Sequence, residues 1–97
     1  MIFSTSQRKY MLLHYDPAIY CTASLLELVS EEKQSLEFEF SLRKLYDLSS
    51  MGNYSLRKSS SFLEEIGFIE RIELHNERGK YSCSKWILHP EAVKECE

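Results

Sequence analysis

Residues 41–71 read SLRKLYDLSSMGNYSLRKSSSFLEEIGFIER, and this stretch decides the fold. Ser41 is a good helix N-cap, and apolar residues then recur at helical spacing over 42–48. After a run of turn-forming residues, the pattern predicts a second helix over about 53–66. Gly67 is suited to end that helix, because glycine enters the left-handed conformation without steric cost. The stretch therefore predicts two helices joined by a short turn.

The second of these helices has two contrasting faces. The face expected to pack inward holds small or apolar residues, namely Leu56, Ser59, Ser60, Leu63 and Ile66. The opposite face holds longer or polar residues, namely Tyr54, Arg57, Lys58, Ser61 and Glu65. Phe68 and Ile69 would then anchor the chain in the core, together with the aromatic residues Phe62, Tyr81 and Trp86.

Upstream of this stretch, the sequence predicts another helix and a short strand. Asp16 and Pro17 form a typical helix start, and the apolar periodicity fades near residues 31–33. Over residues 35–40 apolar and acidic residues alternate, which is typical of a half-buried strand. Residues 1–15 show no clear period, and we expect an arm or a short strand packed on the domain.

Downstream, the sequence predicts a β-hairpin. A strand starts at Ile69, the run NERG at 76–79 signals a turn, and the return strand covers 81–88. The spacing of Cys83 and Trp86 interrupts strict alternation, so a bulge is expected between them. Pro90 ends the strand, and a short helical or frayed tail follows.

These elements predict a single α+β domain over 1–97, with an arm at 1–15 and a tail at 90–97. Their order is helix, short strand, helix, turn, helix and two-stranded hairpin. That layout, and the stretch 41–71 in particular, resembles the winged helix-turn-helix family of small phage, plasmid and bacterial proteins. The resemblance is carried by the leucines of the two motif helices, Leu42, Leu45, Leu48, Leu56 and Leu63. The run FLEEIGFIER at 62–71 resembles the family's exit from its recognition helix, and the 76–81 hairpin resembles its wing.

The resemblance implies sequence-specific binding of double-stranded DNA, as a transcriptional regulator or a replication-associated factor. The distribution of charge agrees with this expectation. The chain has a net charge of −3, yet residues 41–61 hold four basic residues and one acidic residue. Residues 75–88 hold three basic residues and one acidic residue, whereas residues 27–39 hold five acidic residues and one basic residue. Positive charge is thus concentrated on the two predicted DNA-facing elements.

Candidate DNA contacts fall on three segments. On the first motif helix, Arg43 and Lys44 would hold phosphates, which position a protein without reading sequence. On the second motif helix, the candidates for bases and nearby phosphates are Asn53, Tyr54, Ser55, Arg57, Lys58 and Ser61. At the tip of the hairpin, the candidates are His75, Asn76, Arg78 and Lys80.

Other functional classes find less support. The three cysteines form no CxxC motif, and no His and Cys pair has metal-ligand spacing, so neither a disulfide framework nor a metal site is expected. Cys21 and Cys83 are interpreted as small apolar residues and Cys96 as part of a frayed tail. No phosphate-binding glycine loop or nucleophile pattern indicates an enzyme, and no cofactor is expected. The lack of a secretion signal or a membrane-length apolar run favours a cytoplasmic protein with no membrane partner.

The sequence also leaves room for contacts with proteins, either a second copy of this chain or a different protein. A homodimer through the first helix or the N-terminal arm is expected, because one recognition helix reads only a few base pairs. The alternative function is a winged-helix module for protein contact, such as a phage-encoded inhibitor or an assembly adaptor, because fold does not dictate function.

Overall fold

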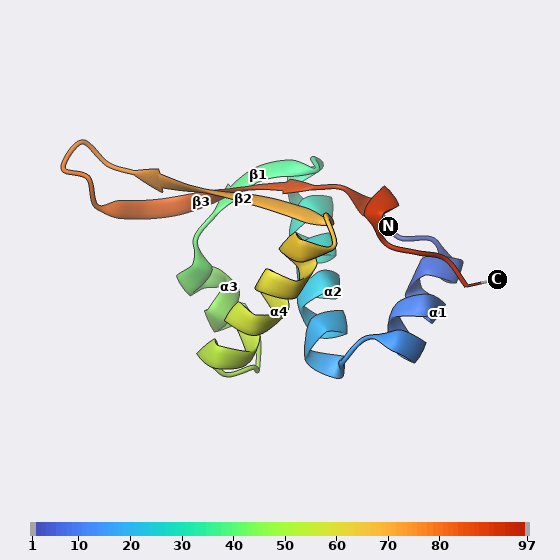
Figure 1. The fold of residues 1–97 in the computed structure, drawn as a ribbon. Helices are drawn as coiled ribbons and strands as arrows, with labels where there is room; N and C mark the ends of the chain where they lie inside the picture. The colour runs from blue at the N-terminus through green and yellow to red at the C-terminus, as the bar shows by residue number, and fades with distance from the viewer. Residues whose placement is uncertain (1, 97) are drawn as a thin grey trace.

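The computed structural model describes residues 2–96 of the chain, without the side chains of residues 81 and 82. Those residues form an α+β arrangement with four α-helices, α1 (Thr5–His14), α2 (Pro17–Lys33), α3 (Leu42–Leu48) and α4 (Asn53–Glu65). The strands are β1 (Glu37–Phe40), β2 (Ile69–His75) and β3 (Tyr81–Leu88), followed by a 3-10 turn, η1 (Pro90–Ala92). The strands pair antiparallel in the order β1-β3-β2, and the helices lie on one side of the sheet (Figure 1). Within residues 2–96 we find no helix with the length and apolar character needed to span a membrane.

The predicted helix starts are confirmed. The carboxylate of Asp16 accepts the backbone N–H of Ala18 at 2.9 Å, and Pro17 is the first residue of α2. The hydroxyl of Ser41 accepts the backbone N–H of Lys44 at 3.0 Å and caps α3. These bonds satisfy donors that a helix leaves unpaired at its start.

The predicted end of α4 is also confirmed, because Gly67 has a φ of +88° directly after this helix. A Cβ at Gly67 would lie 3.8 Å from the Cβ of Ala92, which is an ordinary contact. A side chain at position 67 is therefore destabilising because residues other than glycine rarely adopt this positive φ, and not because of a clash. We expect Gly67→Ala to lower the free energy of unfolding by about 1–2 kcal/mol in urea titrations. Gly52→Ala, at an open position with negative φ, is the control and should cost about half a kcal/mol. Equal losses in the two variants would contradict this explanation.

The N-terminal segment packs on the domain, as predicted for an arm, but it forms the helix α1 and not a strand. Ser4 and Gln7 form a capping box, in which the Ser4 hydroxyl accepts the N–H of Gln7 and the Gln7 side chain accepts the N–H of Ser4. Only Gln7 and Met11 of α1 are buried, whereas Leu12 and Leu13 are exposed. A helix with so narrow a buried face has no clear apolar period, which is why the pattern did not reveal it.

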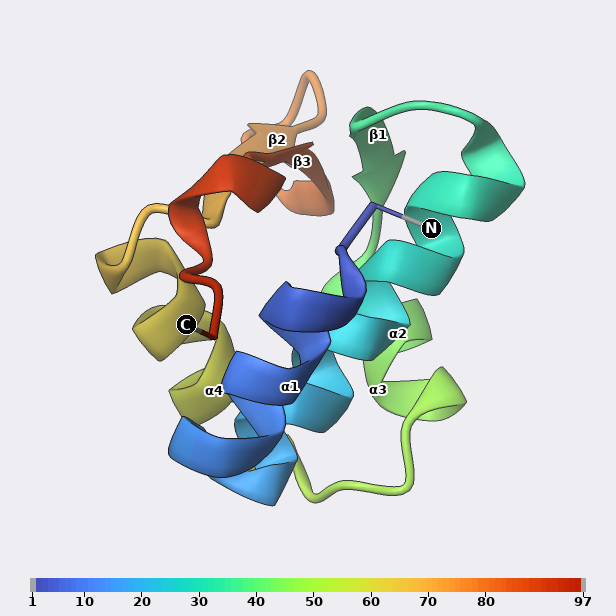
Figure 2. The ribbon, with the colours of Figure 1, turned by 90° about the vertical axis from the view of Figure 1, so that its right-hand side faces the viewer.

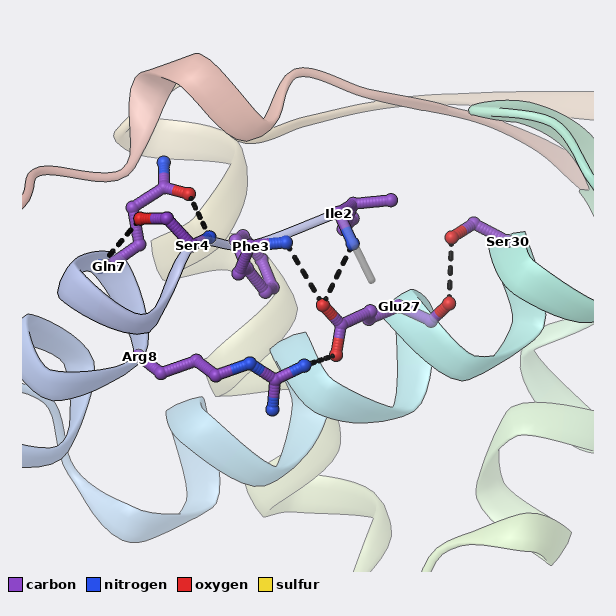
Figure 3. Close-up of polar contacts among 7 residues, drawn as sticks. All are labelled: Ile2, Phe3, Ser4, Gln7, Arg8, Glu27 and Ser30. Carbon is purple, nitrogen blue, oxygen red and sulfur yellow. Dashed lines mark hydrogen bonds and ion pairs between the residues drawn. The ribbon is translucent and has the colours of Figure 1, made fainter.

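A buried carboxylate ties the N-terminus to α2. Glu27 is 4% exposed, and its Oε2 accepts the backbone N–H groups of Ile2 and Phe3 at 3.1 and 3.0 Å. Its Oε1 accepts a hydrogen bond from the guanidinium of Arg8 on α1 (Figure 3). The charge of Glu27 is thus balanced by a cation and two backbone donors inside the protein.

The C-terminal segment begins with the short helical turn η1, as one of the two predicted alternatives had it, and packs against α1, so the frayed alternative is wrong for the described residues. The amide of Gln7 donates to the carbonyl groups of Pro90 and Val93 at 2.7 and 3.0 Å, and Val93 is buried. The Cys96 backbone N–H donates to the carbonyl of Ser6 at 3.2 Å, and the Ser6 hydroxyl donates to the carbonyl of Cys96. Figure 2 shows the two ends of the chain on the same side of the molecule.

The inward face of β3 also differs in part from the prediction. Ser84, Trp86 and Leu88 are buried and alternate regularly, so Cys83 lies on the other face and is only half-buried. The register shift occurs between Leu74 and His75, opposite the start of β3, and not between Cys83 and Trp86.

Burial elsewhere confirms most of the predicted core. Trp86 and Phe68 are fully buried, Ile69 is buried and Phe62 is half-buried. The Trp86 indole N–H donates to the carbonyl of Phe40 at 3.0 Å, which satisfies its polar atom. The side chain of Tyr81 lies outside the described residues. Cys21 is exposed, so burial does not support its interpretation as a small apolar residue.

Candidate nucleic-acid interface

The two predicted faces of α4 are confirmed. Leu56, Ser59, Ser60 and Leu63 are buried, and Ile66 after the helix is half-buried. The opposite face is exposed to solvent, and it carries Tyr54, Arg57, Lys58, Ser61 and Glu65. Tyr54 is 78% exposed, a large value for an aromatic side chain. A helix buried on one side thus presents two cations and hydrogen-bonding groups on the other.

The remaining candidates on α3 and α4 differ in exposure. Arg43, Lys44 and Asn53 are exposed, and Ser55 is half-buried. Arg43 Nε lies 4.0 Å from Asp47 Oδ1, one turn further along α3. That contact is long and both side chains are exposed, so it holds Arg43 only weakly.

The hairpin of β2 and β3 extends well beyond the helices (Figure 1). At its turn, the Asn76 side-chain oxygen accepts the backbone N–H groups of Arg78 and Lys80 at 2.9 and 3.0 Å. Gly79 has a φ of +76°, as the predicted turn requires. The side chains of Arg78 and Lys80 are exposed at this tip. Asn76 therefore shapes the turn with its side-chain oxygen, and the two cations are the groups best placed to contact a partner.

Ion pairs reduce the charge available elsewhere on the sheet. Lys85 Nζ lies 2.6 Å from Glu37 Oε1, and this hydrogen bond and the carboxylate charge raise the pKa of Lys85. The ring Nε2 of His75 lies 4.0 Å from Glu73 Oε2, a contact that is an ion pair only when the imidazole is protonated. Some of the basic residues predicted to contact DNA form no ion pair with another described residue. They are Lys44, Arg57, Lys58, Arg78 and Lys80.

A cation that the sequence pattern did not single out lies between α4 and β2. Arg71 Nε is 3.5 Å from Glu64 Oε1, and Arg71 Nη2 is 3.6 Å from Glu73 Oε1. Its guanidinium carbon lies 5.9 Å from the ring centroid of the buried Trp86. The Arg71 charge is therefore compensated within the protein, and its main effect is to link the hairpin to α4. Only the tertiary arrangement brings Glu64 to Arg71.

Two neighbouring clefts open beside α4. The cleft between α3 and α4 has a volume of about 380 Å³, and it is lined by Leu42, Arg43, Tyr46, Asn53 and Arg57. The cleft between α4 and β2 has a volume of about 290 Å³. Its lining includes Arg57, Ser61, and Arg71 with its ion-pair partners Glu64 and Glu73. The structure thus brings Arg43, Asn53 and Arg57 together, whereas the hairpin tip is a separate site. Tyr46 and Leu42 were not predicted as site residues, because their helical spacing indicated core packing.

No protein-family model, curated protein or solved structure matches this chain. Geometry and charge are therefore what point to its function. Among the described residues, no three His, Cys, Asp or Glu side chains lie close enough together to hold a metal ion.

Proposed function

We propose that this chain is a winged helix-turn-helix protein that binds double-stranded DNA sequence-specifically, as a small transcriptional regulator or a replication-associated factor. The observation that carries the proposal is the outer face of α4. There Arg57 and Lys58 are exposed and form no ion pair with another described residue, in a chain of net charge −3. An α-helix fits the major groove, where each base pair presents a distinct hydrogen-bonding pattern.

The other basic segments suit contacts with the DNA backbone. With α4 in the major groove, Arg43 and Lys44 on α3 would lie beside the phosphates that flank it. The hairpin tip, with Arg78 and Lys80 exposed, would reach phosphates further along the duplex. The acidic segment at 27–39 lies on the end of α2, the loop after it and β1, and not on α3, α4 or the hairpin tip. Binding, and not catalysis, is the activity that this distribution favours.

A salt titration tests the proposal directly. Fluorescence anisotropy with duplexes selected from a random library should show affinity falling steeply with salt, because phosphate contacts release counterions. Four phosphate contacts, from Arg43, Lys44, Arg78 and Lys80, predict a slope of about −3 to −4 in log K against log salt. No duplex binding at low salt, or a slope near zero, would contradict the proposal.

We further propose that the protein acts as a homodimer, through the first predicted helix, which is α2, or through the N-terminal segment, which is α1. Leu12 and Leu13 on α1 are 66% and 67% exposed, and Leu28 on α2 is also exposed. Of these helices, α1 lies at the opposite end of the molecule from the hairpin tip and α2 lies between α1 and α4, so dimer contacts through either helix would leave the tip accessible (Figure 1). The molar mass in solution, measured with and without the selected duplex, distinguishes one copy from two.

The same exposed leucines also favour the second candidate function, a winged-helix module that contacts another protein. Together with the net negative charge of the chain, they would suit an adaptor or an inhibitor. A stable protein complex in a pull-down, combined with no duplex binding at low salt, would favour this function over DNA binding.

A further inference from the structure

The cleft between α3 and α4 has the size of a small-molecule site. Its volume of about 380 Å³ lies at the lower end of the range of about 300–1,000 Å³ that ligand pockets span. It is lined by both charged and apolar side chains, which is typical of pockets that hold amphipathic ligands. A ligand no larger than one nucleotide suits this volume.

The charges around this cleft favour an anion. Arg43 and Arg57 line it, and the nearby Asp47, 4.0 Å from Arg43 Nε, is not among the residues that line it. Arg57 also borders the cleft between α4 and β2, but there Glu64 and Glu73 balance the charges of Arg57 and Arg71. The lining of the first cleft therefore has a net positive charge and that of the second has none, so an anionic group is attracted to the first, where two guanidinium groups can hold phosphate oxygens.

The remaining lining residues favour a planar ring. Tyr46 is 40% exposed and Leu42 is half-buried, so together they offer an aromatic and an aliphatic surface beside the two arginines. Aromatic side chains stack on nucleobases of any sequence. Asn53 supplies an amide that can both donate to and accept from a ring edge, which is the pairing that asparagine makes with adenine.

We propose that this cleft binds a free nucleoside monophosphate, with adenosine monophosphate (AMP) as the preferred ligand. Arg43 and Arg57 hold the phosphate, Tyr46 stacks on the base, and Asn53 bonds to its edge. This site goes beyond the duplex binding proposed above, and testing it requires no DNA. Failure of the ligand site and failure of the DNA-binding proposal are thus distinguishable.

The test is a titration of the full chain with AMP, in which ¹H–¹⁵N NMR and calorimetry measure binding. We expect saturable binding with a dissociation constant below about 1 mM, and shifts at the backbone amides of the lining residues. Tyr46→Ala and Arg43→Gln should each weaken binding about fivefold or more. The matched controls are Leu48→Ala, on the same helix but outside the cleft, and Lys9→Gln, an exposed cation on α1, and both should leave the affinity unchanged.

Titrations with inorganic phosphate and with adenosine show whether the cleft recognises the whole nucleotide or only one part of it. Inorganic phosphate and adenosine should each bind at least about tenfold more weakly than AMP, because each makes only half of the contacts. Phosphate binding as tightly as AMP would reduce the cleft to a simple anion site and overturn the proposal. The proposal also fails if AMP does not saturate, if the control variants weaken binding as much as Tyr46→Ala, or if a single-stranded oligonucleotide binds and AMP does not displace it.

Discussion

Replacing Arg57 and Lys58 together with alanine is expected to lower the affinity for a selected duplex about 100-fold or more. Both side chains lie on the exposed face of α4 and form no ion pair with another described residue, so in the proposed complex they are free to meet base edges or phosphates. A good base contact contributes about 1–3 kcal/mol of discrimination, and the double variant removes two candidates for such contacts. Anisotropy titrations at fixed salt measure the loss.

The same variant should keep its melting temperature within a few degrees, because neither side chain is part of the core. The matched control is Lys9→Ala with Lys94→Ala. It also removes two positive charges, but from exposed positions on α1 and the C-terminal tail. This control should keep most of the duplex affinity. Similar losses in both double variants would show that only bulk charge matters, and the assignment of α4 as the reading helix would then be wrong.

Replacing Glu27 with alanine is expected to lower the free energy of unfolding by a large amount. Removing this carboxylate takes away one acceptor that the backbone N–H groups of Ile2 and Phe3 and the guanidinium of Arg8 share. These groups are buried or partly buried, and Phe3 itself packs in the core against Phe68, with ring centroids 5.1 Å apart. Breaking a buried charge pair costs about 3–5 kcal/mol, so we expect a loss near 3 kcal/mol in the free energy of unfolding, because Arg8 is partly exposed.

Urea denaturation measures this loss, and Glu32→Ala is the matched control. Glu32 is an exposed glutamate on the same helix, so its replacement should change the free energy of unfolding by less than about 0.5 kcal/mol. Amide hydrogen exchange adds a local readout, because residues 2–14 should lose protection first in Glu27→Ala. A Glu27→Ala protein as stable as Glu32→Ala would show that the N-terminal segment is held by apolar contacts alone.

The candidate site could be predicted from the sequence only in part. The outward direction of Arg57 and Lys58 followed from helical periodicity, because Leu56 and Leu63 had to face the core. Pairing of Lys85 with Glu37 did not follow, because these residues are far apart in sequence and meet only when β1 pairs with β3. The role of Tyr46 in a cleft was missed for a related reason, since helical spacing alone cannot show that α4 leaves this ring partly uncovered.

What the sequence by itself determined are the features that act over a few residues. The caps at Asp16 and Ser41, the left-handed Gly67 and the turn at Gly79 were all predictable, because their hydrogen bonds and backbone angles depend on near neighbours. The faces of α4 were predictable for the same reason.

Only the tertiary structure decided how distant segments meet. Gln7 reaches the carbonyl groups of Pro90 and Val93, and Glu27 reaches the N–H groups of Ile2 and Phe3, across 24 to 86 residues of chain. Such contacts form because burial makes an unpaired polar group costly, so each buried donor must find an acceptor wherever packing provides one. Local sequence carries no record of that choice, which is why α1 and the docked C-terminal tail became visible only in the folded chain.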